Sequence, residues 1–293
     1  MSEEHLLPAD DLTVEATGPG PFITRRIYRL KDRRQRIWQS RAHRKKLARA
    51  GAIKLLSFGT LVFRCLWNPR QLNWWIGVIF VLGATLFILG SLLFLIPTLA
   101  ADWALDTHSI NAVFFAGSIP FTTAAYLQLF QAANAGEFSV EGTDSVRETM
   151  FFGWQPLDIG WLSCALQFAG TLLFNLNTFD SMLPGLNWLQ EDLIIWGPNF
   201  LGSLLFFAAG HLAFAEAGNS FLSWHPSGIS WWVTFANLLG CLAFMISAFF
   251  AFVPPSPFGF DAATISVLFT AVGAAGFLCG SLLMLPETAA SNY

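Results

Sequence analysis

Six apolar stretches, each long enough to cross a lipid bilayer, constrain the fold of this chain most strongly. They cover residues 73–96, 109–131, 160–183, 194–215, 230–253 and 262–285. A transmembrane helix needs about 20 apolar residues, and only helices and closed barrels satisfy every backbone polar group in lipid. Only 12% of the 293 residues are charged, against about 25% in a soluble domain. The sequence therefore predicts an all-α integral membrane protein with six transmembrane helices.

An eight-residue pattern of Trp, one residue, Pro, four residues and Trp occurs at residues 67–74, 154–161 and 224–231. In each copy Gly follows nine residues after the second Trp, Phe four residues later, and Pro ten residues after that. Each copy also has a second apolar segment with a Gly-Ser pair, beginning at Gly117, Gly202 or Gly280. Such ungapped columns indicate internal triplication. We therefore predict three tandem two-helix hairpin repeats.

The repeat assigns two groups of residues and divides the chain into parts. The predicted anchors at the membrane interface are Trp67, Pro69, Trp74, Trp154, Pro156, Trp161, Trp224, Pro226 and Trp231. The predicted helix-packing residues are Gly83, Phe87, Gly170, Phe174, Gly240, Phe244, Gly276 and Gly280. The predicted parts are a disordered acidic tail (1–20), a basic cytoplasmic or interfacial segment (21–66), hairpins at 67–134, 154–219 and 224–287, and a polar cytoplasmic loop (135–153).

The basic residues are confined to one part of the chain, which predicts the topology. Of the 16 Lys and Arg residues, all but Arg147 lie between Arg25 and Arg70. Lys and Arg in short flanking segments mark the cytoplasmic side. With six spans, the N-terminus, the loop holding Arg147 and the C-terminus all fall on that side. We therefore expect a multi-pass protein of the bacterial inner (plasma) membrane with both termini in the cytoplasm.

Helix geometry predicts which side of each odd-numbered span faces its neighbours. At about 100° per residue, the repeated Gly lies about 180° from the second Trp, and the repeated Phe lies near the Gly. A small residue lets two helix backbones approach closely in lipid. Trp is favoured at the membrane interface, where its ring is in apolar surroundings and its N–H is near water. We therefore expect Gly and Phe to face the bundle and Trp to face outward, with Phe168 on the lipid side.

The basic segment before the first span has apolar residues that fit a helical stripe. These are Ile27, Leu30, Ile37 and Trp38. Such a helix could lie on anionic lipid headgroups, with about 1 kcal/mol for each basic residue near the surface. The alternative is that the segment only determines topology. A protein partner or an oligomer also stays open, whereas a basic run alone is weak support for nucleic-acid binding.

Polar residues inside membrane spans are the usual candidates for a functional site. Here the candidate polar site consists of Gln167, Asn177, Asn237, His211 and Glu216, with Asn175 and Asn199 nearby in sequence. Gln167 and Asn237 occupy the same column of the repeat. Amides can also simply form hydrogen bonds between helices, at about 0.6–2 kcal/mol each. Proton coupling by His211 and Glu216 is the less favoured alternative, because residues five apart do not stack on one helix face.

The sequence contains no recognisable catalytic constellation. Nucleophile–base pairs, carboxylate pairs and metal-ligand clusters are not evident, and the four cysteines form no CxxC pair. We therefore assign no catalytic, cofactor-binding or metal residue and expect no cofactor. The favoured function is a non-catalytic membrane protein that is structural or interacts with lipids or partners. The alternative is a small-solute transporter or channel with a pathway between the three repeats.

Several residues of the apolar hairpins carry a family resemblance. They are Phe87, Gly90, Ser91 and Phe94, then Gly117, Ser118 and Phe121, and again Gly202, Ser203 and Phe206. This pattern resembles the YrhK-like family of small bacterial membrane proteins, whose domain is a short helical hairpin. The resemblance covers the hairpins only. It implies membrane hairpins and no particular activity, substrate or catalytic residue.

Overall fold

The computed structural model describes residues 12–30, 35–47, 58–136, 149–224, 226, 228–253 and 260–289. Six helices in these ranges are long and apolar enough to cross a membrane, as predicted for a multi-pass membrane protein. They are α3 (Leu72–Leu95), α5 (Thr107–Ala133), α6 (Ile159–Asp180), α8 (Gly197–Gly218), α9 (Ile229–Phe250) and α10 (Ala262–Ala289). The short α7 (Trp188–Gln190) and a π-helical turn (Glu191–Trp196) lead into α8, so the fourth span begins at Trp188.

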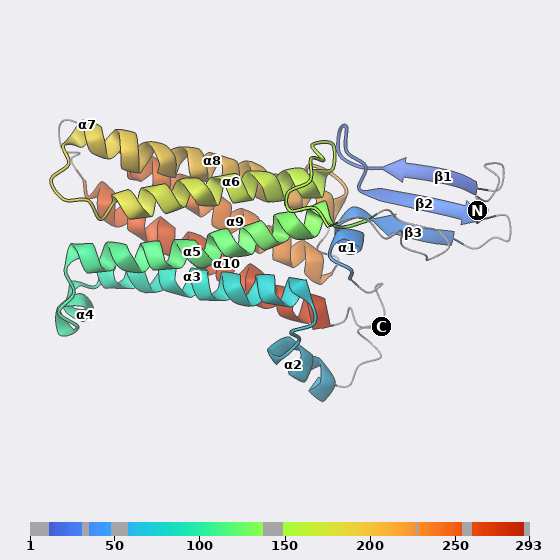
Figure 1. Ribbon diagram of the computed structural model, residues 1–293, viewed down its shortest axis with the longest axis horizontal. Coiled ribbons are helices and arrows are strands. Elements are labelled where there is room, and N and C mark those ends of the chain that lie inside the picture. The colour runs from blue at the N-terminus through green and yellow to red at the C-terminus, as the bar shows by residue number, and fades with distance from the viewer. Residues whose placement is uncertain are drawn as a thin grey trace.

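The six spans form a closed ring. Helix α3 packs against α5, α5 against α6, α6 against α8, α8 against α9, α9 against α10, and α10 returns to α3. Figure 1 shows a β-sheet and α1 at one end of this bundle, and α4 (Pro97–Asp102) and α7 at the other. We call these the sheet end and the far end. The last turn of α10 also lies at the sheet end.

Glycines set the close contact inside each sequential helix pair. A Cβ atom on Gly83 would lie 2.6 Å from the Phe121 ring and 3.0 Å from the Gly117 carbonyl oxygen. Gly170 has the same relation to Phe206 and Gly202, and Gly240 to Phe277 and Gly273. The partner glycines in turn lie against Phe87, Phe174 and Phe244. The repeated Gly and Phe therefore face the neighbouring helix, because only a residue without a side chain permits this approach.

In the last helix, the glycine of the Gly-Ser pair is not the one that makes the close helix contact. Gly273, seven residues before Gly280, makes the contact that Gly117 and Gly202 make in the other pairs. Gly276 packs on the Gly240 backbone, and Gly280 lies against the side-chain amide of Asn237. Gly280 therefore lies about two helical turns beyond the position that corresponds to Gly117 and Gly202. Of the three boundary prolines, Pro97 begins α4, Pro184 lies in the turn after α6, and residue 254 is outside the described residues.

The second tryptophan of each motif corrects the expected outward orientation. Trp74, Trp161 and Trp231 are buried. Their indole N–H groups donate to the backbone carbonyls of Cys65, Phe152 and Ser223 at 2.8, 2.8 and 3.0 Å. Each ring therefore ties its helix to the chain segment that precedes it. This hydrogen bond satisfies the indole away from water, and it decides the orientation over the general preference of Trp for the interface.

The first tryptophan of each motif is exposed and covers the second. Trp67, Trp154 and Trp224 pack edge-on to their buried partners, with ring centroids 5.9, 5.4 and 5.7 Å apart. Edge-to-face pairs of this kind contribute about 0.5–1.5 kcal/mol beyond burial. The motif is therefore a clamp at the start of each odd-numbered span, with one ring inside and one outside.

The N-terminal region corrects three sequence expectations. Strands β1 (Leu12–Thr17), β2 (Arg25–Leu30) and β3 (Gln35–Gln39) form an antiparallel sheet in that order, with Ile27 opposite Ile37. The chain is therefore not all-α, residues 12–17 are not disordered, and the basic segment does not form the expected amphipathic helix. Its residues alternate between the two faces of a strand, a period of two that the loose helical stripe concealed.

Two short helices connect the sheet to the bundle. Helix α1 (Ser40–Arg44) follows β3 directly and enters the sheet end of the ring (Figure 1). Helix α2 (Phe58–Leu66) packs against α10 and exposes Phe63 and Leu66. An exposed apolar face on so short a helix fits the interfacial alternative predicted for residues 21–66, of which 31–34 and 48–57 lie outside the described residues. Arg147 and the middle of the predicted polar loop also lie outside them.

Candidate functional site

Three basic residues from the N-terminal segment are buried at the sheet end of the helix ring. Arg41 and Arg44 of α1 and the following Lys45 are 7%, 5% and 3% exposed. Strand β3 and the turn into α1 deliver them there, whereas Lys46, the next residue, is exposed. Buried cations require carboxylate or hydrogen-bond partners, so the contacts of these three side chains define the site.

Glu216, near the C-terminal end of α8, holds one side of α1. Arg44 Nη2 donates to Glu216 Oε2 at 2.6 Å, and the Ser40 hydroxyl donates to Glu216 Oε1 at 2.6 Å. A second guanidinium nitrogen of Arg44 lies 3.6 Å from Cys164 Sγ. Gly160 makes room for Arg44, because a Cβ atom there would lie 2.5 Å from Arg44 Nε. Helices α6 and α8 therefore enclose this guanidinium.

Glu287, near the end of α10, holds the other side of α1. Arg41 Nη2 and Lys45 Nζ lie 3.2 and 3.0 Å from its two carboxylate oxygens. The Ser230 hydroxyl of α9 also donates to Glu287, at 2.6 Å. Both carboxylates thus accept several hydrogen bonds, which is the condition for a buried ion pair to be tolerated.

The cluster carries more positive than negative charge. Within the described residues, three cations contact two carboxylates, Glu216 and Glu287. The next carboxylate is Asp158, which caps α6 by accepting from the Trp161 backbone N–H. It makes no ion pair with the described residues of α1, but its charge helps to raise the pKa of Arg44. Burial, reinforced by the Arg41 guanidinium, lowers the pKa of Lys45 from 10.5 to about 8 despite Glu287. For Arg44, burial opposes the charge, but Glu216 outweighs it and raises the pKa above its usual value.

A polar cavity of about 40 Å³ lies directly beneath these cations. Arg41, Arg44 and Lys45 form one wall, and the rings of Phe206 and Phe277 contribute apolar surface. Its polar lining from the spans comprises Gln128, Ser163, Gln167, Thr234 and Asn237. The buried side-chain oxygens of Gln128 and Asn237 have no hydrogen-bond partner among the described residues. We call this space the sheet-end cavity.

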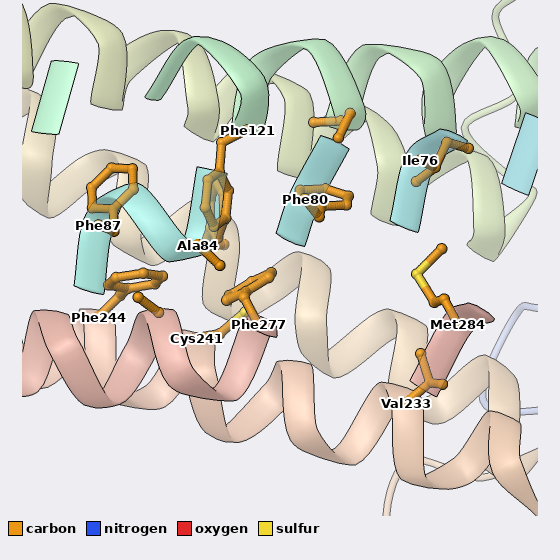
Figure 2. Packing of buried hydrophobic residues seen from close by; sticks show 14 residues of the cluster. Ile76, Phe80, Ala84, Phe87, Phe121, Val233, Cys241, Phe244, Phe277 and Met284 are labelled. Carbon is orange, nitrogen blue, oxygen red and sulfur yellow. The ribbon is translucent and has the colours of Figure 1, made fainter. Parts of the chain in front are cut away.

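Phenylalanine rings fill the middle of the bundle. They come from all six spans and are Phe80, Phe87, Phe121, Phe174, Phe206, Phe244 and Phe277. Neighbouring rings in this set have centroids 4.8 to 6.4 Å apart. Figure 2 shows Phe87 facing Phe244 and Phe121 directed towards Phe277, with Met284 and Val233 further along the same axis. We call this set the phenyl plug.

A second cavity, of about 210 Å³, lies on the other side of the phenyl plug, and its surface is more apolar than polar. It shares Phe87, Phe121, Phe174 and Phe244 with the plug. Its polar lining comprises Asn111, Ser118, Thr171, Asn177, Thr178, Ser181, Asn199, Ser247, Ser266 and Thr270. No charged side chain is among its lining residues. We call it the far-end cavity, because Asn111, Ser181 and Trp196 of its lining belong to the parts of the chain next to the far end.

The structure separates the five candidate polar residues chosen from the sequence. Gln167 and Asn237 line the sheet-end cavity, and Asn177 lines the far-end cavity, where its amide donates to the Ile195 carbonyl at 3.0 Å. Glu216 is in the ion-pair cluster. His211 stacks on Phe221 with ring centroids 6.1 Å apart. The structure thus does not bring His211 and Glu216 together as a proton-coupling pair.

Sequence reasoning missed Arg41, Arg44, Lys45, Glu287 and Gln128. One signal in the sequence is Glu287, because a carboxylate in an apolar helix requires a partner. The basic segment contains nearly all the Lys and Arg residues that could supply it. The basic residues were instead assigned to lipid headgroups. Nothing local in the sequence distinguishes Lys45, which is buried, from Lys46, which is exposed.

The described residues offer little for metal or thiol chemistry. Within them, no group of three or more His, Cys, Asp or Glu side chains could hold a metal ion. The cysteines are free, with Cys164 and Cys241 buried and Cys279 exposed. The sheet-end cavity, with its buried cations, has the size and charge to hold a small polar or charged species. No protein-family model, curated protein or solved structure matches the chain.

Proposed function

We propose that the protein is a gated passage for a small solute along the axis of its six-helix ring. The observation that carries this proposal is the pair of cavities, each lined in part by amide and hydroxyl groups, at opposite ends of one phenyl plug. A core that served packing alone would have no need for amide and hydroxyl groups lining cavities on both sides of it. Hydrophobic constrictions between wet cavities are a common form of channel gate.

The same proposal includes a triplicated hairpin arranged around the passage. Three glycine contacts and three indole hydrogen bonds recur at the matching positions of the repeat. Copies with two spans each keep the same orientation in the membrane, so an axis along the membrane normal would relate them. Each hairpin then contributes phenyl rings to the plug. The relationship to YrhK-like proteins is part of this proposal and rests on the Phe and Gly-Ser residues of the hairpins.

In the proposed orientation the sheet end is cytoplasmic and the membrane is the inner membrane of a bacterium. The concentration of Lys and Arg before the first span supports it. Helix α1 then closes the cytoplasmic end through Glu216 and Glu287. Passage requires the phenyl rings to move and the solute to pass beside α1. No catalytic step and no cofactor are invoked.

The test is the permeability of proteoliposomes containing the full chain. Phe277→Ala shortens a plug side chain that is 2% exposed, and Phe277→Leu is the milder variant. We expect both to increase the rates of glycerol and sodium nitrate entry, measured by light scattering, with the larger effect for Ala. The matched control is Phe249→Ala on the same ring of helices, because Phe249 is 71% exposed and outside the plug.

The alternative is the non-catalytic structural protein that interacts with lipids or protein partners. The tight contacts of the phenyl plug and the buried ion pairs of α1 favour it, because both make a rigid, closed bundle. Equal impermeability of wild-type and both folded Phe277 variants to both solutes would contradict the passage and leave this alternative. Folding of each variant is established beforehand from its thermal unfolding midpoint.

A further inference from the structure

The charge imbalance beneath α1 identifies a binding site. Arg41, Arg44 and Lys45 bring three positive charges into contact with only two carboxylates in the part of the chain that is described. All five side chains are at least nine-tenths buried. An uncompensated buried charge is costly, and proteins compensate it with a counter-charge or by loss of the proton. Arg41 and Arg44 cannot lose a proton at physiological pH. One negative charge would complete the balance.

The surplus charge is best assigned to Lys45. Its ammonium group has three N–H donors, and its one hydrogen bond within the described residues goes to Glu287 Oε2. Arg44 has Glu216 as a close partner, and its one unpartnered nitrogen, Nε, lies against Gly160 of α6. Arg41 makes three contacts with Glu287. Lys45 therefore has donor capacity left over, and it lines the sheet-end cavity.

The cavity wall opposite α1 supplies further polar contacts. Gln128 is 9% exposed and its side-chain oxygen has no partner. Asn237 likewise has an unpartnered oxygen, and Gly280 leaves the room that this amide occupies. In the orientation found, these unpartnered atoms are hydrogen-bond acceptors. Rotation of an amide exchanges its oxygen and nitrogen, and it is the rotated amides that present N–H donors in their place. Leaving them unpaired costs about the desolvation penalty of a buried polar group.

We propose that the sheet-end cavity binds one small monovalent inorganic anion, of the size of a halide or nitrate, between Lys45 and the amides of Gln128 and Asn237. The volume of about 40 Å³ restricts the ligand to a few atoms. The positive surplus excludes a cation. A divalent anion would reverse the imbalance to one unpaired negative charge, so the site should prefer a single charge.

If the bound anion is also the transported solute, that part of the inference rests on the proposed function. As a binding site it stands independently, because binding requires no passage through the phenyl plug. Measuring binding in detergent and flux in proteoliposomes therefore separates the two. Anion binding without flux would contradict the passage and leave the binding site supported. Flux of glycerol without anion binding would contradict the binding site and leave the passage supported.

The experiment measures thermal unfolding of the full chain in detergent at pH 7. Sodium nitrate or chloride replaces sodium gluconate, which is too large for the cavity, at constant ionic strength. Binding to the folded state alone raises the midpoint in a saturable manner, and we expect a rise of about 2–4 °C. Lys45→Met should abolish this rise, because it leaves two cations and two carboxylates. Lys46→Met, the same change at the exposed neighbour, should retain it.

A direct measurement covers the case in which Lys45→Met does not fold. Crystals of the wild-type chain grown in sodium bromide should show an anomalous bromide peak between Lys45 and Gln128. Gln128→Leu removes an amide but no charge. It should raise, several-fold, the nitrate concentration needed for half of the rise in the unfolding midpoint. Absence of the bromide peak, or a Lys45→Met protein stabilised by nitrate like wild type, would overturn the proposal.

Discussion

Arg44 Nη2 lies 2.6 Å from Glu216 Oε2, and the two residues are 172 positions apart in the chain. Their side chains are 6% and 0% exposed. The contact ties the N-terminal segment to the end of the fourth span, across the sheet end of the ring. Because the pair is buried, its two charges depend on each other far more than a surface pair would.

Removing the Glu216 charge should therefore destabilise the protein strongly. Glu216→Gln keeps the shape of the side chain but leaves Arg44 without a carboxylate, and breaking a buried pair costs about 3–5 kcal/mol. The matched control is Glu15→Gln, which breaks the exposed pair that Glu15 makes with Arg29 at 2.8 Å. That change should cost about 0–1 kcal/mol. Thermal unfolding in detergent measures both, and comparable losses would contradict the buried pairing.

Gly170 should not tolerate even one added methyl group. A Cβ there would lie 2.6 Å from the Phe206 ring, which is fully buried, so Gly170→Ala should cost about 1–3 kcal/mol of unfolding free energy through overpacking. Gly59→Ala in α2 is the control, since none of the described residues has an atom within 4 Å of its Cβ position. In a helix that change should be neutral or stabilising by up to about 1 kcal/mol. The reverse order of stabilities would contradict the close helix contact.

The sequence-based choice of Phe168 as a lipid-facing control for this experiment was wrong. Phe168 is half-buried and packs against Tyr126 and Phe152, with centroids 5.7 and 6.3 Å away. The angle from Trp161 placed it outside only because Trp161 was assumed to face outward. Gly170 on the same helix still faces α8 as expected, so the helix is not rotated. Trp161 is buried because it packs against a second neighbour, beside Leu129 and Ala132 of α5. Leu172, which is exposed on α6, is the suitable site for a lipid-facing substitution.

The two tryptophans of the second motif should differ in importance. Trp161→Phe removes an indole N–H that donates to the Phe152 carbonyl at 2.8 Å, and we expect a loss of about 0.5–1.5 kcal/mol in stability, with a further loss from the smaller ring. Trp154→Phe changes a ring that is 83% exposed and should have a smaller effect. Equal midpoints for the two variants in thermal unfolding would contradict the clamp.

Lys45 should make stability depend on alkaline pH. The charged or titratable groups of this cluster are Arg41 and Arg44 of α1, Cys164 of α6, Glu216 of α8 and Glu287 of α10, with Asp158 at the start of α6. Its pKa is about 8 in the folded chain and 10.5 in its ordinary environment. Between these values the unfolded chain binds more protons, so the unfolding free energy contributed by Lys45 rises with pH. Below pH 8 both states are protonated and the contribution stays constant.

The measurement compares wild type with Lys45→Met in gluconate from pH 7 to 10. Groups other than Lys45 contribute to both proteins, so the difference between their curves isolates this residue. We expect wild type to gain stability relative to Lys45→Met as the pH rises through 8. In nitrate, the stabilisation by the anion should decline over the same range, because neutral Lys45 removes the surplus charge. Parallel curves in gluconate would contradict the burial of a protonated Lys45.

The membrane topology can be tested with single cysteines introduced at the two ends of the bundle. Gln35→Cys places the thiol on exposed β3 at the sheet end, and Ala101→Cys places it on exposed α4 at the far end. In intact cells, a membrane-impermeant maleimide should label Ala101→Cys and should not label Gln35→Cys. Both variants are made in a background without the natural cysteines. The opposite labelling would reverse the proposed orientation.

The sequence predicted the six spans because each one satisfies its backbone hydrogen bonds within itself and requires only a long apolar run. The predicted spans begin and end within a few residues of the helices, except the fourth, whose start at Trp188 precedes the expected residue 194. The inward position of Gly170 also followed from the repeat, since a column of glycines in lipid has a packing reason. In these respects the local sequence contains the physical cause of the structure.

The tertiary structure alone decided the burial and pairing of polar side chains whose partners lie far away in the chain. The indole of Trp161 finds a carbonyl that the upstream loop presents, and Arg44 finds Glu216 only when β3 and α1 enter the ring. The strands of the basic segment likewise depend on pairing with one another rather than on a local pattern. Charge and apolar periodicity determine where the chain crosses the membrane, whereas the burial of Lys45 beside the polar cavity depends on contacts that no single segment specifies.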